Sequence, residues 1–135
     1  MMPAVANFLD TNILVYALAD DEKSSVAQGL MKRPFVLSVQ ALNEFANVGR
    51  RKLDLSWERV SGHVEDIVIA ARLILPVEPE FTRAALRLAP RYKLAFYDAL
   101  MVAAARSAGC SAYYSEDLHH GLIIDGQLTV INPFR

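Results

Sequence analysis

The sequence predicts an α/β fold of three layers, in which helices cover both faces of a central, mostly parallel sheet of about five strands. Short apolar segments alternate along the chain with longer segments of helical periodicity. Continuous apolar strands of this kind are typical of sheets buried on both faces. Neither an internal repeat nor a linker rich in Gly, Ser or Pro divides the 135 residues, so we expect a single domain over residues 1–135.

Each expected strand is a short apolar segment bounded by polar or turn-forming residues. The first contains Asn7 as its one polar interruption, the third contains Pro76, and the last ends at Asn132 and Pro133. The expected strands are residues 4–9, 35–37, 73–77, 112–114 and 128–131.

The expected helices are marked by residues that favour helix ends. Asp10, Ser38 and Ser56 are N-cap types ahead of the first, third and fourth helices, and Gly109 is suited to the left-handed turn that ends the last one. The last helix is apolar nearly all round, which predicts a buried central position. The expected helices are residues 13–19, 24–32, 39–52, 57–72, 78–91 and 96–108.

Composition and charge exclude several classes of protein. The apolar content of 53% supports a core and excludes a disordered chain. The longest segment without a charged residue has ten residues, 34–43, whereas a membrane span needs about 20. The net charge of −1 means that any nucleic-acid binding depends on a local patch. A lone cysteine, Cys110, and the lack of a basic residue before Lys23 predict a cytoplasmic protein without a secretion signal.

Four carboxylates stand at positions where structure alone explains them only in part. Asp10 follows the first strand, Asp117 follows the fourth, Glu44 lies on the apolar face of the third helix, and Asp98 begins the apolar last helix. Each has an ordinary interpretation. Asp10 would be a helix N-cap and Asp117 a polar loop residue. Glu44 would reach solvent past its apolar neighbours, and Asp98 would stabilise the helix dipole from the first turn. Glu116 competes with Asp117 for any role at this edge.

Taken together, these acids predict a metal site. The carboxyl ends of parallel strands meet at one edge of a sheet, where such folds bind ligands. Clustered carboxylates repel one another unless a cation lies between them, and oxygen ligands suit Mg²⁺ or Mn²⁺. No Cys and His set with zinc spacing exists, and we expect His63, His119 and His120 at the surface.

Five segments carry these residues: FLDTNILVY at 8–16, SVQALNEF at 38–45, FYDAL at 96–100, YSEDL at 114–118 and INPF at 131–134. In order and spacing they resemble PIN-domain ribonucleases of the VapC toxin type, the toxin half of a toxin–antitoxin pair. Ser115 stands where many relatives have threonine, and residues 20–34 look shorter than usual, which bears on partner binding more than on catalysis.

The resemblance implies a metal-dependent endoribonuclease that hydrolyses RNA with Mg²⁺ or Mn²⁺. The implied acidic set is Asp10, Glu44, Asp98 and Asp117, with Thr11 and Ser115 orienting the acids or a metal-bound water. Asp10 and Asp98 are the expected direct ligands. Glu44 is a ligand, directly or through water, or a general base, and Asp117 helps to hold a second ion.

The resemblance also implies partners: a homodimer and a cognate antitoxin that lies in an apolar groove. We expect this groove along the helices at residues 13–18 and 57–73, and an arginine of the antitoxin that enters the acidic set would inhibit the enzyme. Basic residues that could contact RNA are Arg50, Arg51 and Lys52 beyond Glu44, and Arg83, Arg87 and Arg91 on one helix face, although a solvated face is their ordinary interpretation.

Two other classes of function stay open. The first is a metal-dependent phosphatase or phosphotransfer domain on a similar sheet, which usually needs a second aspartate two residues beyond the first and a nearby lysine. Position 12 is Asn12, and Lys93 is the only lysine after Lys52. The second is a non-catalytic binding module, against which the complete acidic set argues.

Overall fold

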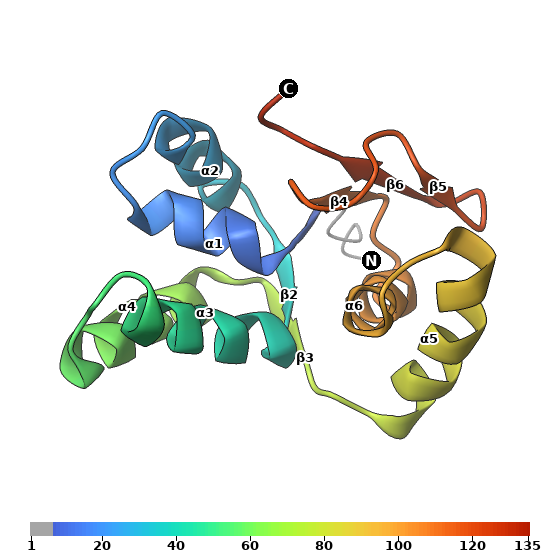
Figure 1. Cartoon of the computed structure of the whole chain (residues 1–135), viewed down its shortest axis with the longest axis horizontal. Helices are drawn as coiled ribbons and strands as arrows, with labels where there is room; N and C mark the ends of the chain where they lie inside the picture. The colour runs from blue at the N-terminus through green and yellow to red at the C-terminus, as the bar shows by residue number, and fades with distance from the viewer. Residues whose placement is uncertain (1–6) are drawn as a thin grey trace.

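The computed structural model describes residues 7–135, in which the strands form one sheet (Figure 1). The strands are β1 (Asn7–Leu9), β2 (Val36–Ser38), β3 (Leu73–Leu75), β4 (Ala112–Tyr114), β5 (Ile123–Ile124) and β6 (Leu128–Ile131). Their order across the sheet is β3-β2-β1-β4-β6-β5. Every pairing is parallel except that of β5 with β6.

The helices lie on both sides of the sheet. They are α1 (Thr11–Leu18), α2 (Ser24–Met31), α3 (Val39–Arg51), α4 (Trp57–Ala70), α5 (Pro79–Tyr92) and α6 (Phe96–Ser107). Figure 1 shows α1 to α4 gathered on one side of β2 and β3, with α5 and α6 on the other. None of the helices described is long and apolar enough to cross a membrane.

The layered α/β arrangement is as expected, with one more strand than expected. Strands β4 and β6 have the expected bounds, whereas residues 4–6 of the first expected strand lie outside the described residues. Strand β3 ends before Pro76, which has no N–H to continue a ladder. The unexpected strand β5 turns into β6 through Asp125 and Gly126, which both have positive φ. Asp-Gly is a known hairpin signal, but a strand of two residues shows no periodicity.

The residues that the sequence indicated at helix ends are confirmed in that role, although several helix bounds differ by one or two residues. The Ser38 hydroxyl accepts a hydrogen bond from the Gln40 amide at 3.0 Å, and the Ser56 hydroxyl accepts one from the Arg59 amide at 3.1 Å. Gly109 has a φ of 75° after α6, as a left-handed helix end requires. Helix α1 begins two residues earlier than expected, because Asp10 is its N-cap.

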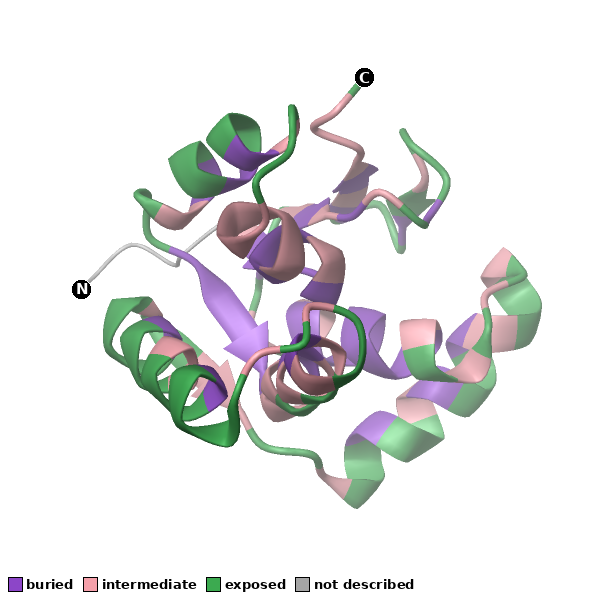
Figure 2. Ribbon diagram, turned by 60° about the vertical axis from the view of Figure 1, so that its left-hand side comes forward, coloured by how far each residue is buried: buried purple, intermediate pink, exposed green. Residues whose placement is uncertain are grey.

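Strand β1 lies at the middle of the sheet, where the strand order reverses. From β1 the chain proceeds outward through β2 and β3, and it then returns to pair β4 against the other side of β1. Here Phe8 stacks on Tyr113 with ring centroids 5.2 Å apart, and α6 is buried from Ala99 to Ala105. Figure 2 shows the buried residues gathered in the sheet and on the inner faces of the helices. A point of reversal leaves a crevice beyond the carboxyl ends of β1 and β4, the usual ligand site of such folds.

Candidate functional site

Four carboxylates meet at this reversal point. Asp10 follows β1, Asp117 follows β4, Glu44 belongs to α3, and Asp98 lies in the first turn of α6. The charges of Asp98 and Asp117 act on Asp10, and those of Asp117 and Glu44 act on Asp98. The structure therefore brings together all four acids that the sequence indicated, and we call them the acid cluster.

Asp10 is the most deeply buried member of the acid cluster, at 5% exposure. Its Oδ1 accepts a hydrogen bond from the Thr11 amide and its Oδ2 accepts one from the Ser115 hydroxyl, both at 2.7 Å. Burial raises the pKa of Asp10 to about 6, and the neighbouring charges of Asp98 and Asp117 add to this, while the two hydrogen bonds oppose it. Asp10 is thus held by dipoles, with no cation beside it among the described residues.

Glu44 is half-buried and fixed through both of its oxygens. The Thr11 hydroxyl donates to Oε2 at 2.5 Å, and Nε2 of Gln40 donates to Oε1 at 3.0 Å. The same Gln40 nitrogen donates to the Tyr97 carbonyl at 3.3 Å, which connects α3 to the start of α6. Gln40 is a site residue that the sequence analysis missed, although it lies one turn before Glu44 on the same face.

Asp98 carries the least compensated charge of the acid cluster. Its side chain makes no hydrogen bond or ion pair with any residue in the described range. Burial raises its pKa first, and the charges of Asp117 and then Glu44 raise it further. A carboxylate in this position is expected to attract an external cation.

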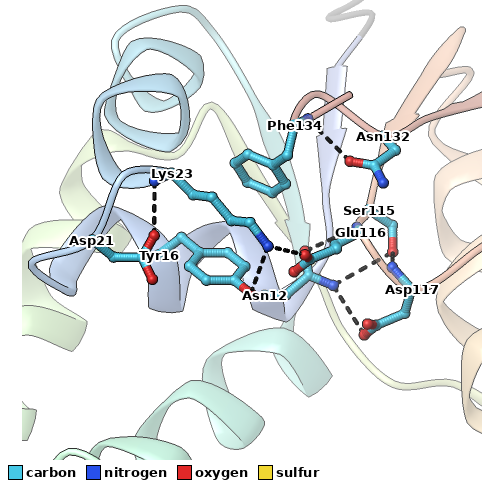
Figure 3. Close-up of polar contacts among 9 residues, drawn as sticks. All are labelled: Asn12, Tyr16, Asp21, Lys23, Ser115, Glu116, Asp117, Asn132 and Phe134. Atoms are coloured by element: carbon cyan, nitrogen blue, oxygen red, sulfur yellow. Dashed lines mark hydrogen bonds and ion pairs between the residues drawn. The ribbon is translucent and has the colours of Figure 1, made fainter.

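Asp117 is positioned by Asn12, another residue that the sequence analysis did not assign to the site (Figure 3). Nδ2 of Asn12 donates to Oδ2 of Asp117 at 3.1 Å, and Oδ1 of Asn12 accepts from the Glu116 amide at 3.2 Å. The Asp117 amide donates to the Ser115 hydroxyl at 3.1 Å. Ser115 therefore links Asp10 to the turn that carries Asp117.

Glu116 belongs to a separate group, which we call the lysine cluster: Tyr16, Lys23, Glu116 and Phe134. The Lys23 ammonium pairs with Glu116 and lies 4.9 Å from the Tyr16 ring centroid and 5.5 Å from that of Phe134 (Figure 3). Hydrogen bonds from Lys23 and then Tyr16 lower the pKa of Glu116. The charge of Glu116 is matched within the protein. Asp117 is therefore the acid of this turn that belongs to the acid cluster.

Tyr113 places a buried hydroxyl beneath the acid cluster. The side chain has 0% exposure, and its hydroxyl makes no hydrogen bond of ordinary geometry within the described residues, although it lies close enough to Asp10 for that contact to raise the Tyr113 pKa. Burial, and then the charges of Asp10, Asp98 and Glu44, hold the pKa of Tyr113 well above its usual range. From the sequence, Tyr113 was predicted only as a residue of a strand, since its hydroxyl has no signature in an apolar segment.

Two hollows meet at Asp117, one on each side of the acid cluster. The first, of about 430 Å³, lies between α1 and α3, and its lining includes Thr11, Glu44 and Lys52. The second, of about 310 Å³, lies beside the start of α6, and its lining includes Asp98 and Lys93. Asp117 lines both hollows, whereas Glu44 lines only the first and Asp98 only the second.

The other basic residues that the sequence indicated line neither of these two hollows. Arg50 donates to the Leu55 carbonyl at 2.7 Å and its guanidinium lies 4.6 Å from the Trp57 ring centroid. Arg87 and Arg91 line a separate hollow of about 470 Å³, in which Arg91 approaches Asp125 at 3.5 Å.

The histidines lie away from the acid cluster or at its rim. His119 and His120 are exposed, as expected, and His119 lines the second hollow. His63 is half-buried instead of exposed and lines a fourth hollow of about 390 Å³ between α1, α2 and α4.

The acid cluster is open, in contrast to a preformed metal cage. Among residues 7–135, no three Asp, Glu, His or Cys side chains converge closely enough to hold a metal ion as they stand. The donor set still fits a hard divalent ion: it is all oxygen, its charges are uncompensated, and a buried Tyr113 hydroxyl beside it lacks a partner. Mg²⁺ commonly binds through one or two carboxylates and keeps several waters, so it does not need a closed cage.

Comparisons with known proteins agree with this architecture. The PIN domain family model matches residues 8–120. A chain of a toxin–antitoxin complex from Klebsiella pneumoniae is similar in structure, with a TM-score of 0.70, 22% identity, and coverage of 96% of this chain and 98% of that one. A chain of DNA-bound VapBC from Salmonella typhimurium has a TM-score of 0.68, 19% identity, and coverage of 93% and 96%.

A third similar structure is VapC20 from Mycobacterium tuberculosis, a toxin that cleaves the sarcin–ricin loop. Its TM-score is 0.66, its identity is 20%, and the match covers 80% of this chain and 87% of that one. No curated protein matches the sequence. Identities this low establish a shared fold, whereas the family match spans most of the sequence. The chain belongs to the PIN domain family.

Proposed function

We propose that this protein is a metal-dependent endoribonuclease that hydrolyses RNA phosphodiester bonds in the cytoplasm, as the toxin of a toxin–antitoxin pair. The observation that carries the proposal is the acid cluster, in which four segments place carboxylates at one crevice without a matching cation in the described residues. Membership of the PIN family and similarity to VapC20, described as a toxin that cleaves the sarcin–ricin loop, support the same activity.

In this proposal Asp10 and Asp98 hold Mg²⁺ or Mn²⁺ directly, and Glu44 and Asp117 complete the site. A bound ion of this kind supplies an activated water and stabilises charge on the leaving oxygen. Burial keeps Asp10 in a low-dielectric position, where its attraction for a cation is strong. Asp98, which has no other partner in the described range, needs no bond broken before it binds.

The uncharged residues of the site orient the acids. Thr11 acts on two of them, since its amide binds Asp10 and its hydroxyl binds Glu44. Ser115 fixes the other oxygen of Asp10. With one hydrogen bond on each oxygen, the Asp10 carboxylate cannot rotate freely and keeps its remaining lone pairs for a ligand. In this proposal Glu44, which is held at both oxygens, accepts a proton from an attacking water.

The proposed antitoxin lies in the apolar groove between α1, α2 and α4. Leu14 and Leu18 of α1 and Ile67 of α4 line this hollow of about 390 Å³, and α1 and α4 are the helices that the sequence analysis indicated. The Klebsiella chain belongs to a toxin–antitoxin complex, which supports a partner of this kind. We also propose a homodimer, on the family resemblance alone.

The partner assignment is tested with Leu18→Glu. This change should relieve inhibition by the cognate antitoxin while RNA cleavage by the partner-free protein stays within about twofold, because Leu18 lies outside the acid cluster. Inhibition that is as strong as in the wild type would remove the groove from the proposal. Light scattering of the purified protein tests the dimer.

The nuclease proposal is tested by incubating partner-free protein with total RNA, with and without Mg²⁺ or Mn²⁺, alongside Asp10→Asn. Discrete fragments that need both the metal and Asp10 are expected. A parallel assay with a phosphomonoester separates this activity from that of a phosphatase. Cleavage that persists in Asp10→Asn, or that needs no divalent ion, would refute the proposal.

A further inference from the structure

The side-chain amide of Gln40 connects the segments that carry two members of the acid cluster. Gln40 lies one turn before Glu44 in α3, and its Nε2 donates to Oε1 of Glu44 at 3.0 Å and to the Tyr97 carbonyl at 3.3 Å. The amide nitrogen carries two hydrogens, so it serves both acceptors at once. Tyr97 immediately precedes Asp98 in the first turn of α6. One amide therefore joins Glu44 to the backbone beside Asp98.

The two acceptors determine which way the Gln40 amide faces. A carboxylate oxygen and a carbonyl oxygen only accept hydrogen bonds, so the opposite orientation would place Oε1 of Gln40 against two oxygens. The observed orientation leaves Oε1 buried without a hydrogen-bond partner in the described residues. A buried acceptor without a partner destabilises the folded protein. Methionine has a similar length and lacks this atom, so the needs of the fold alone do not favour glutamine here.

A purely structural role for Gln40 has to be weighed, because its bond to Tyr97 joins two helices. No other hydrogen bond or ion pair joins α3 to α6 in the part of the chain that the structure describes. Helix α6 is already fixed by a face that is buried from Ala99 to Ala105, so one partly exposed hydrogen bond adds little to its packing. A tie between helices would also need only the Tyr97 carbonyl, whereas Glu44 is the closer of the two acceptors.

Glu44 depends on Gln40 for one of its two hydrogen bonds, since the other comes from the Thr11 hydroxyl. A half-buried glutamate that is free to rotate loses rotamer entropy when a reaction requires one orientation. With both oxygens bound, that entropy is lost during folding, before a substrate binds. Asp98 has no such partner among the described residues. Its position relative to Glu44 is set by the backbone of α6, which Gln40 joins to α3.

We infer that Gln40 is a positioning residue, whose amide holds the Glu44 carboxylate in one orientation and at a fixed separation from Asp98. The inference rests on the proposed function, in which Glu44 accepts a proton from an attacking water and Asp98 binds the metal ion. In this role Gln40 acts through Glu44 and makes no contact with the RNA. Its loss should therefore slow the chemical step and leave RNA binding unchanged.

The experiment measures kcat and KM for an RNA that the wild type cleaves, using Gln40→Met and Gln40→Glu. Gln40→Met keeps the length of the side chain but has no N–H group. Gln40→Glu keeps the shape of the amide but turns its donor into an oxygen that faces Glu44 and the Tyr97 carbonyl. The matched control is Gln127→Met, which changes an exposed glutamine of the β5–β6 turn whose carbonyl is bound by Arg106, outside the acid cluster.

Gln40→Met should lower kcat by about tenfold while KM stays within about twofold, because a group that orients the site is lost and no contact with RNA is removed. Its melting temperature should stay within about 3 °C of the wild type, since removal of the unpartnered Oε1 offsets the lost hydrogen bonds. Gln40→Glu should lower kcat at least as far, because it repels Glu44. A residue that only supported the fold would give the milder effect in Gln40→Glu, which keeps its shape.

A second measurement needs no activity and follows the Gln40 side-chain amide by NMR in metal-free, ¹⁵N-labelled protein. Gln40→Met identifies the signal. In the wild type this amide should exchange hydrogen with solvent at least about tenfold more slowly than that of Gln127, since both of its hydrogens are bonded. The signal should also shift in Glu44→Ala. Fast exchange, or a signal that Glu44→Ala leaves unchanged, would overturn the inference.

The two measurements separate failure of this inference from failure of the proposed function. If the wild type cleaves RNA and Gln40→Met matches Gln127→Met in kcat, Gln40 does not position the site and the nuclease proposal stands. A rise in KM with kcat unchanged would also overturn the inference, because Gln40 would then act in binding. If the wild type cleaves no RNA but the amide exchanges slowly and responds to Glu44→Ala, Gln40 holds Glu44 as inferred and the nuclease proposal fails.

Discussion

The acid cluster and the lysine cluster lie side by side at the same edge of the sheet, and their members Asp117 and Glu116 are adjacent in the chain. Glu116 has an ammonium within contact distance, and its pKa is lowered. Asp10 and Asp98 have only hydrogen bonds or other carboxylates around them in the described residues, and their pKa values are raised. The carboxylate of the lysine cluster is thus stabilised in its ionised form, whereas those of the acid cluster are destabilised in theirs.

The difference shows which carboxylates serve the fold and which serve a ligand. A matched pair such as Lys23 and Glu116 joins the start of α2 to the turn after β4, and Phe134 packs over it. An unmatched cluster costs stability in the protein alone, and this cost is recovered only when a cation binds. Changes in the two clusters should therefore have opposite effects on stability and on activity.

The largest expected effect is loss of cleavage in Asp98→Asn. Removing one ionised metal ligand should lower the rate of RNA cleavage by more than about 100-fold. Loss of a residue that only hydrogen-bonds to a metal ligand usually lowers activity by about 10- to 100-fold. The metal-free protein should become more stable at pH 7, since a half-buried charge that is repelled by its neighbours is lost. Cleavage rates and thermal melts of the same preparation measure both effects, and a variant that is inactive because it is unfolded would contradict the account.

The second prediction concerns the pH dependence of the metal-free protein. The pKa of Asp10 is about 6 in the folded state against an ordinary value of 3.8, so between these values the native state binds more protons than the unfolded state. The free energy of unfolding should therefore fall as pH rises through this window, by up to about 3 kcal/mol. Asp10→Asn should flatten the curve.

Denaturant melts from pH 4 to 8 in chelator provide the measurement for this prediction. Added Mg²⁺ should restore stability at the upper end, where Asp10 is ionised. Glu116 contributes with the opposite sign, since its lowered pKa means that its stabilising charge is lost as pH falls. If the free energy of unfolding instead rises with pH through this window in both the wild type and Asp10→Asn, ionisation of Asp10 does not destabilise the folded protein.

A third prediction separates the two states of the acid cluster through Tyr113→Phe. Removing a buried hydroxyl that has no partner should stabilise the metal-free protein by about 1 kcal/mol. The same change should weaken Mn²⁺ binding by about tenfold, because a hydroxyl beside Asp10 is then unavailable to the bound ion or its waters. Opposite signs in the two measurements are required, and a loss of stability without metal would indicate a hydrogen bond to Asp10 instead.

The smallest expected effect is that of Glu116→Gln in the lysine cluster. Loss of a partly exposed ion pair should lower the melting temperature by at most about 4 °C. Cleavage should stay within about threefold of the wild type, since the carboxamide retains the size of Glu116 and the acid cluster is unchanged. A loss of activity comparable to that of Asp98→Asn would place Glu116 in the catalytic site.

The sequence predicted the members of the acid cluster more completely than the bonds that hold them. Asp10 and Asp98 could be found because an acid after a buried strand, or on an apolar helix, is anomalous in its local segment. Glu116 and Asp117 could not be told apart, because their difference depends on Lys23, which lies 93 residues away along the chain. Local patterns contain no information about such pairs.

The fold shows the same division. Strands and helices with strong local signals were predicted to within a few residues, whereas β5 has two residues and no period to detect. Tyr113 fits the apolar pattern of β4 so well that its hydroxyl passed unnoticed. The openness of the acid cluster depends on distances between segments, which the order of residues does not determine.

The most direct test of the account is calorimetric titration of Mn²⁺ and Mg²⁺ into the partner-free protein, with Asp98→Asn and Glu116→Gln as a matched pair. We expect binding in the wild type and in Glu116→Gln, and none in Asp98→Asn. Near pH 6 Asp10 is partly protonated, and metal binding should displace this proton into the buffer. The measured heat should therefore depend on the buffer used. Equal binding by all three proteins, or loss of binding only in Glu116→Gln, would contradict the claim that the acid cluster is the metal site.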